Sequence, residues 1–314
     1  MAPKIETRMV AANGLTFEVD QAGSGFGAEG AKGDPEPQMS KQGSKFALLL
    51  HGFPESKYSW RFQIPLLVKL GYRVWAPNLR GYGKTSKPEG VNAYYIDRLL
   101  DDVGGLIDAA GAKETLLVTH DWGSIIGWQF AMRKVKPLEG LVVMNVPHPA
   151  CFLREIVRSD QLLRSWYMLL FQLPVIPEWR LVANDAEVIT RSFLSMAVDR
   201  SRFPKEVTDE YRRSAQEPGA AKAMVNYYRA LLRTKLSVAN PKPGTVDVRT
   251  LMIWGASDMA LNNATTKGTE RYVKDFTLRM LPNVSHWVQQ EAPEKVNAIM
   301  EAWLSGKEVP YFGV

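Results

Sequence analysis

The fold is decided by residues 116–124, which read Leu116-Leu117-Val118-Thr119-His120-Asp121-Trp122-Gly123-Ser124. An apolar run of strand length ends at a polar residue, and an apolar pattern with helical spacing resumes directly after it. This order predicts a strand, a sharp turn and a helix, an arrangement that lifts the side chain at the turn clear of the sheet. That side chain is Asp121. A carboxylate nucleophile forms an ester with an alkyl carbon, whereas a serine is acylated by a carbonyl carbon, so Asp121 predicts a change of substrate class.

Strand-length apolar runs alternate with helix-length segments along most of the chain, at residues 46–50, 73–76, 115–119, 141–144, 250–254 and 277–281. Such alternation predicts a mainly parallel sheet with helices on both faces. Residues 5–22 are expected to form two antiparallel strands, because Asn13-Gly14 suits the positive φ angles of a tight hairpin turn. Residues 23–44 are rich in Gly, Pro, Lys, Gln and Ser and are expected to form an exposed loop.

The alternation stops between Pro147 and Pro243, where strand-like runs vanish and Leu, Trp, Phe and Arg recur at helical spacing. This change predicts a helical cap over residues 147–243, inserted between the two parts of a core at 1–146 and 244–314. An insertion between two strands can lie over the C-terminal edge of the sheet, where α/β folds keep their sites.

Two further polar residues, an acid and a histidine, follow predicted strands further along the chain. Hydrolases with this kind of turn have their catalytic residues in the order nucleophile, acid, histidine. Asp258 comes after the strand at 250–254, and His286 comes after the strand at 277–281. Because the C-terminal ends of parallel strands meet at one edge, both are expected to converge on Asp121. The other position used for the acid in such folds holds Asn145, which carries no charge, so Asp258 is the preferred acid.

A glycine turn, His51-Gly52-Phe53-Pro54, follows the first of the predicted parallel strands. Its Phe53 N–H, together with the N–H of Trp122, is expected to form a two-donor oxyanion hole. The histidines His51, His120 and His148 are interpreted as buried hydrogen-bonding or hinge residues. Position 119 is Thr where the turn usually has Gly, which we expect the turn to tolerate because a small residue suffices.

Composition excludes several classes of protein. Cys151 is the only cysteine, so an internal disulfide and a thiolate zinc site are excluded, and a reducing cytoplasm is the expected location. The net charge is +6, but Lys and Arg are spread among Asp and Glu, which argues against a nucleic-acid partner. No apolar run approaches the roughly 18 residues of a membrane span. A monomer or homodimer is expected.

With these motifs in place, the chain resembles the soluble epoxide hydrolases of the α/β-hydrolase superfamily. The matching segments extend from about Phe46 to the C-terminus: His51-Gly52-Phe53-Pro54-Glu55-Ser56, Ser59-Trp60-Arg61, Pro77-Asn78-Leu79-Arg80-Gly81-Tyr82-Gly83, His120-Asp121-Trp122-Gly123 and Asn145-Val146-Pro147-His148-Pro149. The resemblance implies an α/β-hydrolase fold with an inserted helical cap. The family usually has Asp at the position of Asn78, in a structural turn.

The family also carries two cap tyrosines that hydrogen-bond the epoxide oxygen. Residues 167–174, Tyr-Met-Leu-Leu-Phe-Gln-Leu-Pro, resemble the first tyrosine segment, and residues 226–229, Asn-Tyr-Tyr-Arg, resemble the second. The resemblance therefore implies Tyr167 and Tyr228, with Tyr227 as the rival of the latter. An alkoxide is a very poor leaving group unless a donor such as a phenol stabilises it, so the chemistry needs such residues.

The mechanism that the resemblance implies needs no metal or cofactor, only a small apolar epoxide and water. Asp121 opens the epoxide and forms a hydroxyalkyl ester, with Tyr167 and Tyr228 stabilising the departing oxygen. His286, oriented by Asp258, then activates the water that releases a vicinal diol. An apolar pocket is expected around the site, lined by Trp122, Phe53, Trp166, Phe171 and Trp287.

Two alternatives remain open. A haloalkane dehalogenase shares the Asp turn, the following Trp, the acid and the histidine, but its halide needs N–H donors. Phe53 stands where dehalogenases commonly place an Asn donor, so Trp166 or Trp179 would have to supply the second one. A ligand-binding protein without turnover is the other alternative, and it should have lost part of the catalytic set.

Overall fold

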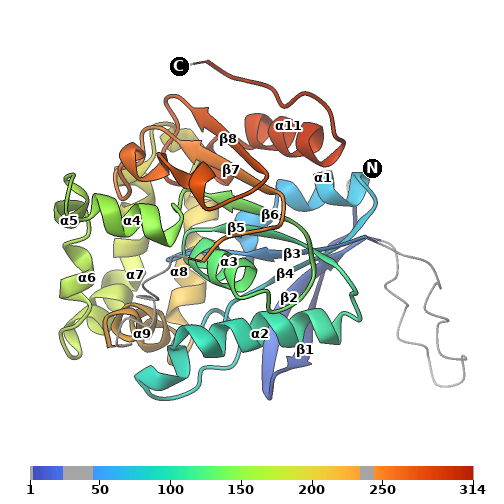
Figure 1. The fold of residues 1–314 in the computed structure, drawn as a ribbon. Helices are drawn as coiled ribbons and strands as arrows, with labels where there is room; N and C mark the ends of the chain where they lie inside the picture. Colours follow the sequence, from blue (N-terminus) through green and yellow to red (C-terminus); the bar gives the residue numbers. More distant parts are fainter. Residues whose placement is uncertain (1–2, 24–44, 234–243, 314) are drawn as a thin grey trace, which may run out of the picture.

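The computed structural model describes residues 3–23, 45–233 and 244–313. Their eight strands form one sheet in the order β1-β2-β4-β3-β5-β6-β7-β8 (Figure 1). The strands are β1 (Glu6–Ala12), β2 (Leu15–Ala22), β3 (Lys45–Leu50), β4 (Tyr72–Pro77), β5 (Thr115–His120), β6 (Leu138–Met144), β7 (Thr250–Gly255) and β8 (Phe276–Leu281). The expected loop at 23–44 lies outside the described residues except for Gly23.

The predicted strands are confirmed, with end points that shift by a few residues. Strands β3 to β8 pair in parallel, and β1 and β2 run antiparallel at one edge. The hairpin turns at the predicted dipeptide, since Ala12 pairs with Leu15 and the φ angles of Asn13 and Gly14 are 47° and 69°. β5 lies in the middle of the sheet, so the residue after it stands at the centre of the C-terminal edge.

Helices cover both faces of the sheet. One apolar cluster joins the sheet to α1 (Gln63–Lys69), α10 (Val288–Glu291) and α11 (Pro293–Leu304). The other cluster joins the opposite face to α2 (Ile96–Ala109) and α3 (Trp122–Met132), and it continues into the insertion between β6 and β7. Short 3₁₀ turns complete the described residues: η1 (Lys57–Trp60), η2 (Val91–Tyr94), η3 (Arg200–Arg202), η4 (Asn263–Thr266) and η5 (Thr269–Arg271).

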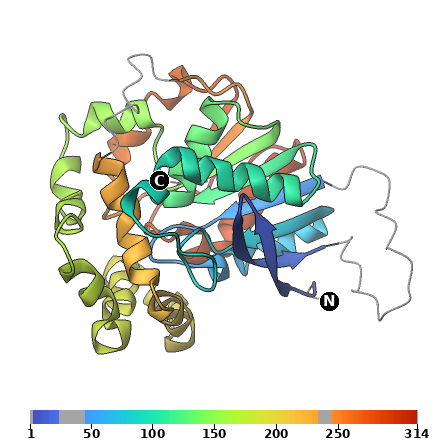
Figure 2. The same cartoon turned by 90° about the horizontal axis from the view of Figure 1, so that it is seen from below.

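The insertion consists of helices and turns, with no strand among its described residues 145–233. Its helices are α4 (Pro149–Glu155), α5 (Gln161–Arg164), α6 (Tyr167–Leu170), α7 (Ile176–Met196), α8 (Lys205–Gln216) and α9 (Ala220–Arg233). Figures 1 and 2 place them together at one end of the core. The predicted end of the cap at 243 lies outside the described residues, so the division at 147 and 243 stays a prediction.

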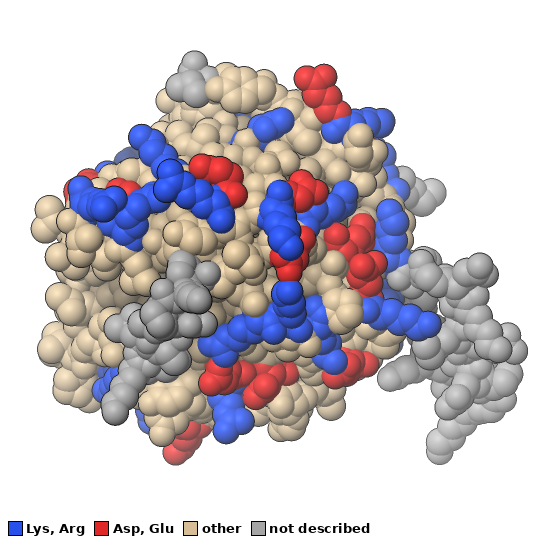
Figure 3. Space-filling view, viewed as in Figure 1, with Lys and Arg blue, Asp and Glu red and all other residues tan. Residues whose placement is uncertain are grey.

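Charged side chains of both signs are interspersed on the face shown in Figure 3. In the described helices, several ion pairs join residues one helical turn apart, such as Arg191 with Glu187 and Arg164 with Asp160. In the described part of the chain, no helix is both long and apolar enough to cross a membrane.

Candidate active site

Asp121 occupies a strained turn between β5 and α3. Its φ and ψ are 47° and −119°, a region that non-glycine residues adopt at a cost and that occurs at functional sites. The next turn of chain is held by the Gly123 N–H, which donates to the His51 carbonyl at 3.1 Å. A Cβ atom on Gly123 would lie 2.1 Å from the Leu50 carbonyl oxygen, so only glycine fits there. The helix therefore begins directly beneath the carboxylate of Asp121.

Thr119 replaces the usual glycine of this turn, and a glycine on the facing helix makes room for it. A Cβ atom on Gly127 would lie 2.9 Å from Cγ2 of Thr119. The Thr119 hydroxyl donates to the Val142 carbonyl at 2.8 Å and lies 3.0 Å from the Ser124 hydroxyl. Thr119 is larger than glycine, and it fits because Gly127 on the facing helix has no side chain.

The two oxygens of the Asp121 carboxylate face different partners. Oδ1 accepts a hydrogen bond from the Phe53 N–H at 2.7 Å, and Oδ2 lies 3.5 Å from Nε2 of His286. Burial raises the pKa of Asp121, but the hydrogen bond and positive charge of His286 outweigh it and lower the pKa below 3.8. The side chain keeps 17% of its surface exposed, so an ionised carboxylate is held in place and is still accessible.

His286 is held between two carboxylates. Its Nδ1 lies 2.7 Å from Oδ2 of Asp258, while Oδ1 of Asp258 accepts the N–H groups of Ala260 and Leu261 at 2.7 and 2.9 Å. Burial lowers the pKa of His286, but Asp258 and Asp121 together raise it to about 10. The structure thus brings Asp121, Asp258 and His286 together.

Asn145 has a role that the sequence reasoning missed. It stands after β6 with a φ of 48°, and its side-chain N–H donates to Oδ2 of Asp258 at 2.7 Å. Its Oδ1 accepts the Gly255 N–H at 2.9 Å. Asn145 therefore orients Asp258 rather than competing with it for the role of the acid. The signal was its place at the end of a strand, at the same edge as Asp121.

Tyr167 and Tyr228 come from α6 and α9 and belong to one aromatic cluster. Their ring centres are 5.8 Å apart, and the Tyr228 ring lies 5.3 Å from Phe53 and 5.1 Å from Trp122. Burial raises the pKa of Tyr167, with further increases from the charges of Asp121 and Asp258. Burial also raises the pKa of Tyr228, as do Tyr167 and Asp121, so both phenols stay protonated at neutral pH.

Tyr227, the rival of Tyr228, points elsewhere. Its hydroxyl donates to the Arg80 carbonyl at 2.8 Å and is fully buried. Burial raises the pKa of Tyr227, and the charges that add to this are those of Tyr82, Asp102 and Tyr94, not that of Asp121. The Tyr227 hydroxyl therefore already has a partner other than Asp121.

The residues named for the apolar pocket do not all lie together. Phe171 packs against Phe53 and Tyr228, with ring centres 5.5 and 4.7 Å away. Trp287 lies on the side of His286, at 5.0 Å, and contacts Phe193 of α7 at 4.4 Å. Trp166 is 63% exposed, so we omit it from the proposed pocket.

The other histidines are buried, and the hydrogen bonds of His51 define its tautomer. Nδ1 of His51 donates to the Gly52 carbonyl at 2.8 Å, and Nε2 accepts the Leu79 N–H at 3.0 Å. Burial lowers the pKa of His51 to about 4, which keeps this neutral form. His120 lies 2.7 Å from Glu55, a fully buried carboxylate that the sequence reasoning assigned no role.

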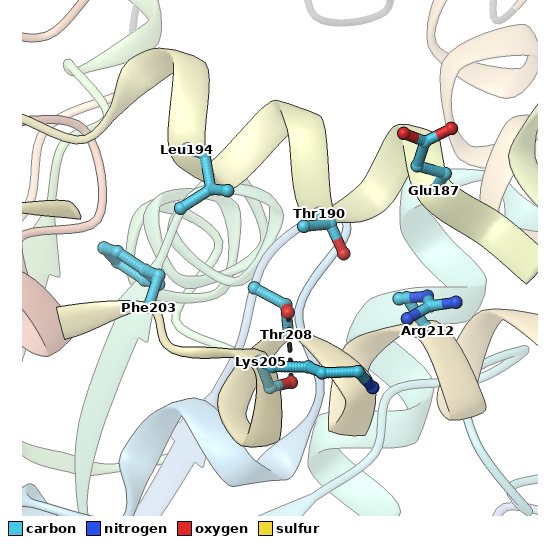
Figure 4. A pocket seen from close by; sticks show the side chains of 7 residues that line it. All are labelled: Glu187, Thr190, Leu194, Phe203, Lys205, Thr208 and Arg212. Atoms are coloured by element: carbon cyan, nitrogen blue, oxygen red, sulfur yellow. Dashed lines mark hydrogen bonds between the residues drawn. The ribbon is translucent and has the colours of Figure 1, made fainter. Parts of the chain in front are cut away.

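Two cavities lie within the cap, away from Asp121. One of about 310 Å³ lies between α7 and α8 and is lined by Glu187, Thr190, Leu194, Phe203, Lys205, Thr208 and Arg212 (Figure 4). The other, of about 510 Å³, lies between the start of α7 and the turn before α9. Neither cavity is lined by the proposed site residues. Among the residues that the structure describes, no group of three or more His, Cys, Asp or Glu could hold a metal ion.

Comparison with known proteins places this chain in a family. Residues 48–293 match the model of the alpha/beta hydrolase fold. A Bacillus subtilis AB hydrolase superfamily protein, YfhM, is 34% identical over 96% of this chain and 99% of its own length. Mouse epoxide hydrolase 4 is 36% identical over 84% of this chain and 74% of its own length. The chain belongs to the α/β-hydrolase family, among the epoxide hydrolases.

Solved structures agree with this placement. A Bacillus megaterium epoxide hydrolase in complex with an inhibitor superposes with a TM-score of 0.82, at 27% identity over 95% of this chain and all of that one. Epoxide hydrolase A from Mycobacterium thermoresistibile gives a TM-score of 0.76, at 28% identity over 98% of this chain. The predicted fold class and the resemblance stated from the motifs are thereby confirmed.

Proposed function

We propose that this chain hydrolyses small apolar epoxides to vicinal diols through a covalent ester on Asp121. Relatives and structural neighbours named as epoxide hydrolases support the reaction class. The observation that carries the finer proposal is the placement of Asp121. Its carboxylate is ordered by the Phe53 N–H and His286, and its charge acts on the two cap phenols, Tyr167 and Tyr228. The proposed cap, residues 147–243, supplies both phenols.

In the first half-reaction, a carboxylate oxygen of Asp121 attacks an epoxide carbon and the carbon–oxygen bond of the ring breaks. The leaving oxygen becomes an alkoxide, which accepts hydrogen bonds from Tyr167 and Tyr228 and is then protonated. His286 loses a proton in the same half-reaction, so the number of protons balances. Two carboxylates raise the pKa of His286, and the part of that increase due to Asp121 is lost once Asp121 is a neutral ester.

In the second half-reaction, neutral His286 takes a proton from water, and the hydroxide adds to the ester carbonyl carbon of Asp121. The N–H groups of Phe53 and Trp122 are the proposed donors to the tetrahedral oxyanion. Trp122 starts α3, where a backbone N–H has no partner within the helix. Collapse breaks the ester bond, and the departing diol oxygen takes the proton from His286. The proton left on the carboxyl group of Asp121 then passes to His286, which restores the carboxylate and the protonated histidine.

The test combines two substrates with one variant. Purified protein is incubated with a styrene oxide-type epoxide and with a bromoalkane, and diol and bromide are measured. We expect diol; bromide without diol would overturn the proposal in favour of a dehalogenase. The His286→Gln variant should accumulate an ester on Asp121, seen as a protein mass increase equal to the mass of the epoxide.

Isotope labelling separates the covalent mechanism from direct attack by water. A single turnover in ¹⁸O-water, with enzyme in excess, should give unlabelled diol, because the new diol oxygen comes from the Asp121 carboxylate. The label should then be found in Asp121. Labelled diol in the first turnover would exclude the ester.

Of the dehalogenase donors considered, Trp166 and Trp179 are each 63% exposed, so neither supports the alternative.

A further inference from the structure

Glu55 is the centre of a buried polar network behind the catalytic residues. Its carboxylate is fully buried and accepts four hydrogen bonds, from the Gly52 N–H at 2.9 Å and from His120, Gln289 and Gln290 at 2.7 Å each. Burial raises the pKa of Glu55, but His120 and the Gly52 N–H more than offset this and leave it lowered. A buried carboxylate with four donors is a fixed point, because losing one partner leaves part of a buried charge unsatisfied.

His120 links this fixed point to the catalytic histidine. Its Nδ1 faces the Glu55 carboxylate, and its Nε2 lies 2.8 Å from the backbone carbonyl of His286. A carbonyl oxygen can only accept, so the Nε2–H of His120 donates to the His286 carbonyl, while Nδ1 lies against the Glu55 carboxylate. The backbone position of His286 is thereby tied to Glu55.

Gln290 links the same fixed point to the cap. Its side-chain N–H₂ donates to Oε1 of Glu55, and its own carbonyl oxygen accepts from the Tyr211 hydroxyl at 2.5 Å and from Arg61 at 2.8 Å. Tyr211 belongs to α8 of the insertion and is fully buried. A continuous chain of hydrogen bonds therefore runs from Tyr211 through Gln290, Glu55 and His120 to the His286 carbonyl.

A second contact keeps the Tyr211 ring in place without the hydroxyl. The ring stacks on Phe193 of α7, with centres 4.7 Å apart at 21°, and Phe193 contacts Trp287, the residue after His286. Removing only the hydroxyl of Tyr211 therefore leaves this packing and isolates the hydrogen-bond route.

We propose that Tyr211 is a positioning residue for the second half-reaction, which couples the seating of the cap helix α8 to the orientation of His286. The inference rests on the proposed function of Asp121 and His286. We expect ester formation to be insensitive to this chain of bonds, because Oδ1 of Asp121 is held by the turn after β5 and by the Phe53 N–H at 2.7 Å, whereas the contact of Oδ2 with His286 is looser, at 3.5 Å. Ester hydrolysis does depend on it, since His286 must deliver its Nε2 to a water molecule.

The test compares Tyr211→Phe with Tyr94→Phe in single-turnover reactions on a styrene oxide-type epoxide. Tyr94 is 2% exposed, and its hydroxyl donates to the Pro88 carbonyl at 2.9 Å, outside the network, so both variants lose one buried hydroxyl. Protein mass gives the amount of ester, and the diol gives its hydrolysis. Tyr211→Phe should slow hydrolysis roughly tenfold, the effect of one hydrogen bond of about 1.4 kcal/mol, and accumulate ester while ester formation is unchanged.

A double-variant comparison checks the route. If the effect passes through Gln290, the Tyr211→Phe/Gln290→Leu variant hydrolyses the ester no more slowly than Gln290→Leu alone. Equal slowing of both half-reactions by Tyr211→Phe, or ester levels that match those of Tyr94→Phe, would overturn the positioning role alone. Wild-type protein that forms neither ester nor diol would overturn the proposed function, and the role of Tyr211 with it.

Discussion

Asn145 shows how a neutral neighbour sets the properties of Asp258, the proposed acid of the triad. In Asn145→Asp, a second carboxylate would stand about 2.7 Å from Asp258, where the structure has a donating N–H. Two carboxylates this close share a proton, so the charge that holds His286 is reduced. The left-handed backbone at this position, with a φ of 48°, tolerates Asp as it does Asn, so the change is electrostatic rather than conformational.

We predict that Asn145→Asp slows ester hydrolysis by roughly ten- to a hundredfold, the range expected for disturbing a positioned base. Single-turnover mass measurements of the ester across pH 6–9 test this. Hydrolysis at the wild-type rate throughout that range would show that Asn145 does not orient Asp258.

Asn78, at the position where the resemblance implies Asp, has hydrogen-bond partners that suit an amide. Its side-chain N–H donates to Oε2 of Glu18 at 2.7 Å, and its Oδ1 accepts the Lys57 N–H at 2.8 Å. An Asp at this position would face the Glu18 carboxylate with no hydrogen to donate. The amide is therefore matched to Glu18 on β2.

We predict that Asn78→Asp lowers the free energy of unfolding by about 1–3 kcal/mol, the cost of an unsatisfied buried polar group. Adding Glu18→Gln should recover most of the loss, because an amide then faces the new carboxylate. Urea unfolding of the wild type, both single variants and the double variant measures the coupling. Additive losses in the double variant would rule out the pairing.

At the scale of elements, the contact of β5 with α3 depends on how Thr119 of the strand fits against Gly127 of the helix. Gly127→Ala places a methyl group 2.9 Å from Cγ2 of Thr119, so the helix and strand must move apart, at a cost of about 1–3 kcal/mol. Thr119→Ser removes that methyl group and keeps the hydroxyl that binds the Val142 carbonyl. We therefore predict that Thr119→Ser/Gly127→Ala is more stable than Gly127→Ala alone.

The rescue is independent of helix propensity, because Gly127→Ala and the double variant both carry Ala, which is favoured over Gly inside a helix by about 1 kcal/mol. Thermal unfolding of the four proteins in this cycle measures it, and diol formation reports whether the Asp121 turn survives. A Gly127→Ala variant as stable as the wild type would show that β5 and α3 are not in tight contact.

The elements themselves were predictable because each has a local signal. Buried parallel strands read as short apolar runs, and the Asn13-Gly14 turn fixes the hairpin register by itself. That Asp121, Asp258 and His286 lie close together was predictable because each follows a strand, and parallel strands end at one edge. The distal boundary of the cap, at residue 243, lies outside the described residues and stays a prediction.

At the scale of the whole molecule, the residues that sequence reasoning missed are those whose partners are distant in the chain. Glu55, Gln290 and Tyr211 come from three segments, and each is an ordinary polar residue in its own segment. Only the folded arrangement shows that they form one network. Trp166 is a different case, because aromatic content was its only signal and its exposure argues against a place in the pocket.

The dependence of overall stability on pH follows from two buried histidines of opposite kind. Burial lowers the pKa of His51 from 6.5 to about 4, so the folded chain resists a proton that the unfolded chain accepts below pH 6.5. Stability from His51 is therefore present above pH 6.5 and lost as pH falls toward 4. The carboxylates around His286 raise its pKa from 6.5 to about 10, so its contribution is present below pH 6.5 and lost as pH rises through 10.

We predict that the free energy of unfolding is greatest near neutral pH and falls on both sides. The shift of His51, 6.5 − 4 or about 2.5 pKa units, corresponds to about 3 kcal/mol, and it gives an acid limb with a slope of about 1 kcal/mol per pH unit. We expect urea unfolding of His51→Gln between pH 4.5 and 6 to show a slope of the unfolding free energy against pH that is smaller by about 1 kcal/mol per pH unit. In His286→Gln the acid limb should remain and the fall between pH 7 and 10 should be smaller. In the folded chain, protonation of His51 would place a hydrogen on Nε2, which now accepts the Leu79 N–H. If His51→Gln leaves the loss of stability at acid pH unchanged, protonation of other groups unfolds the chain.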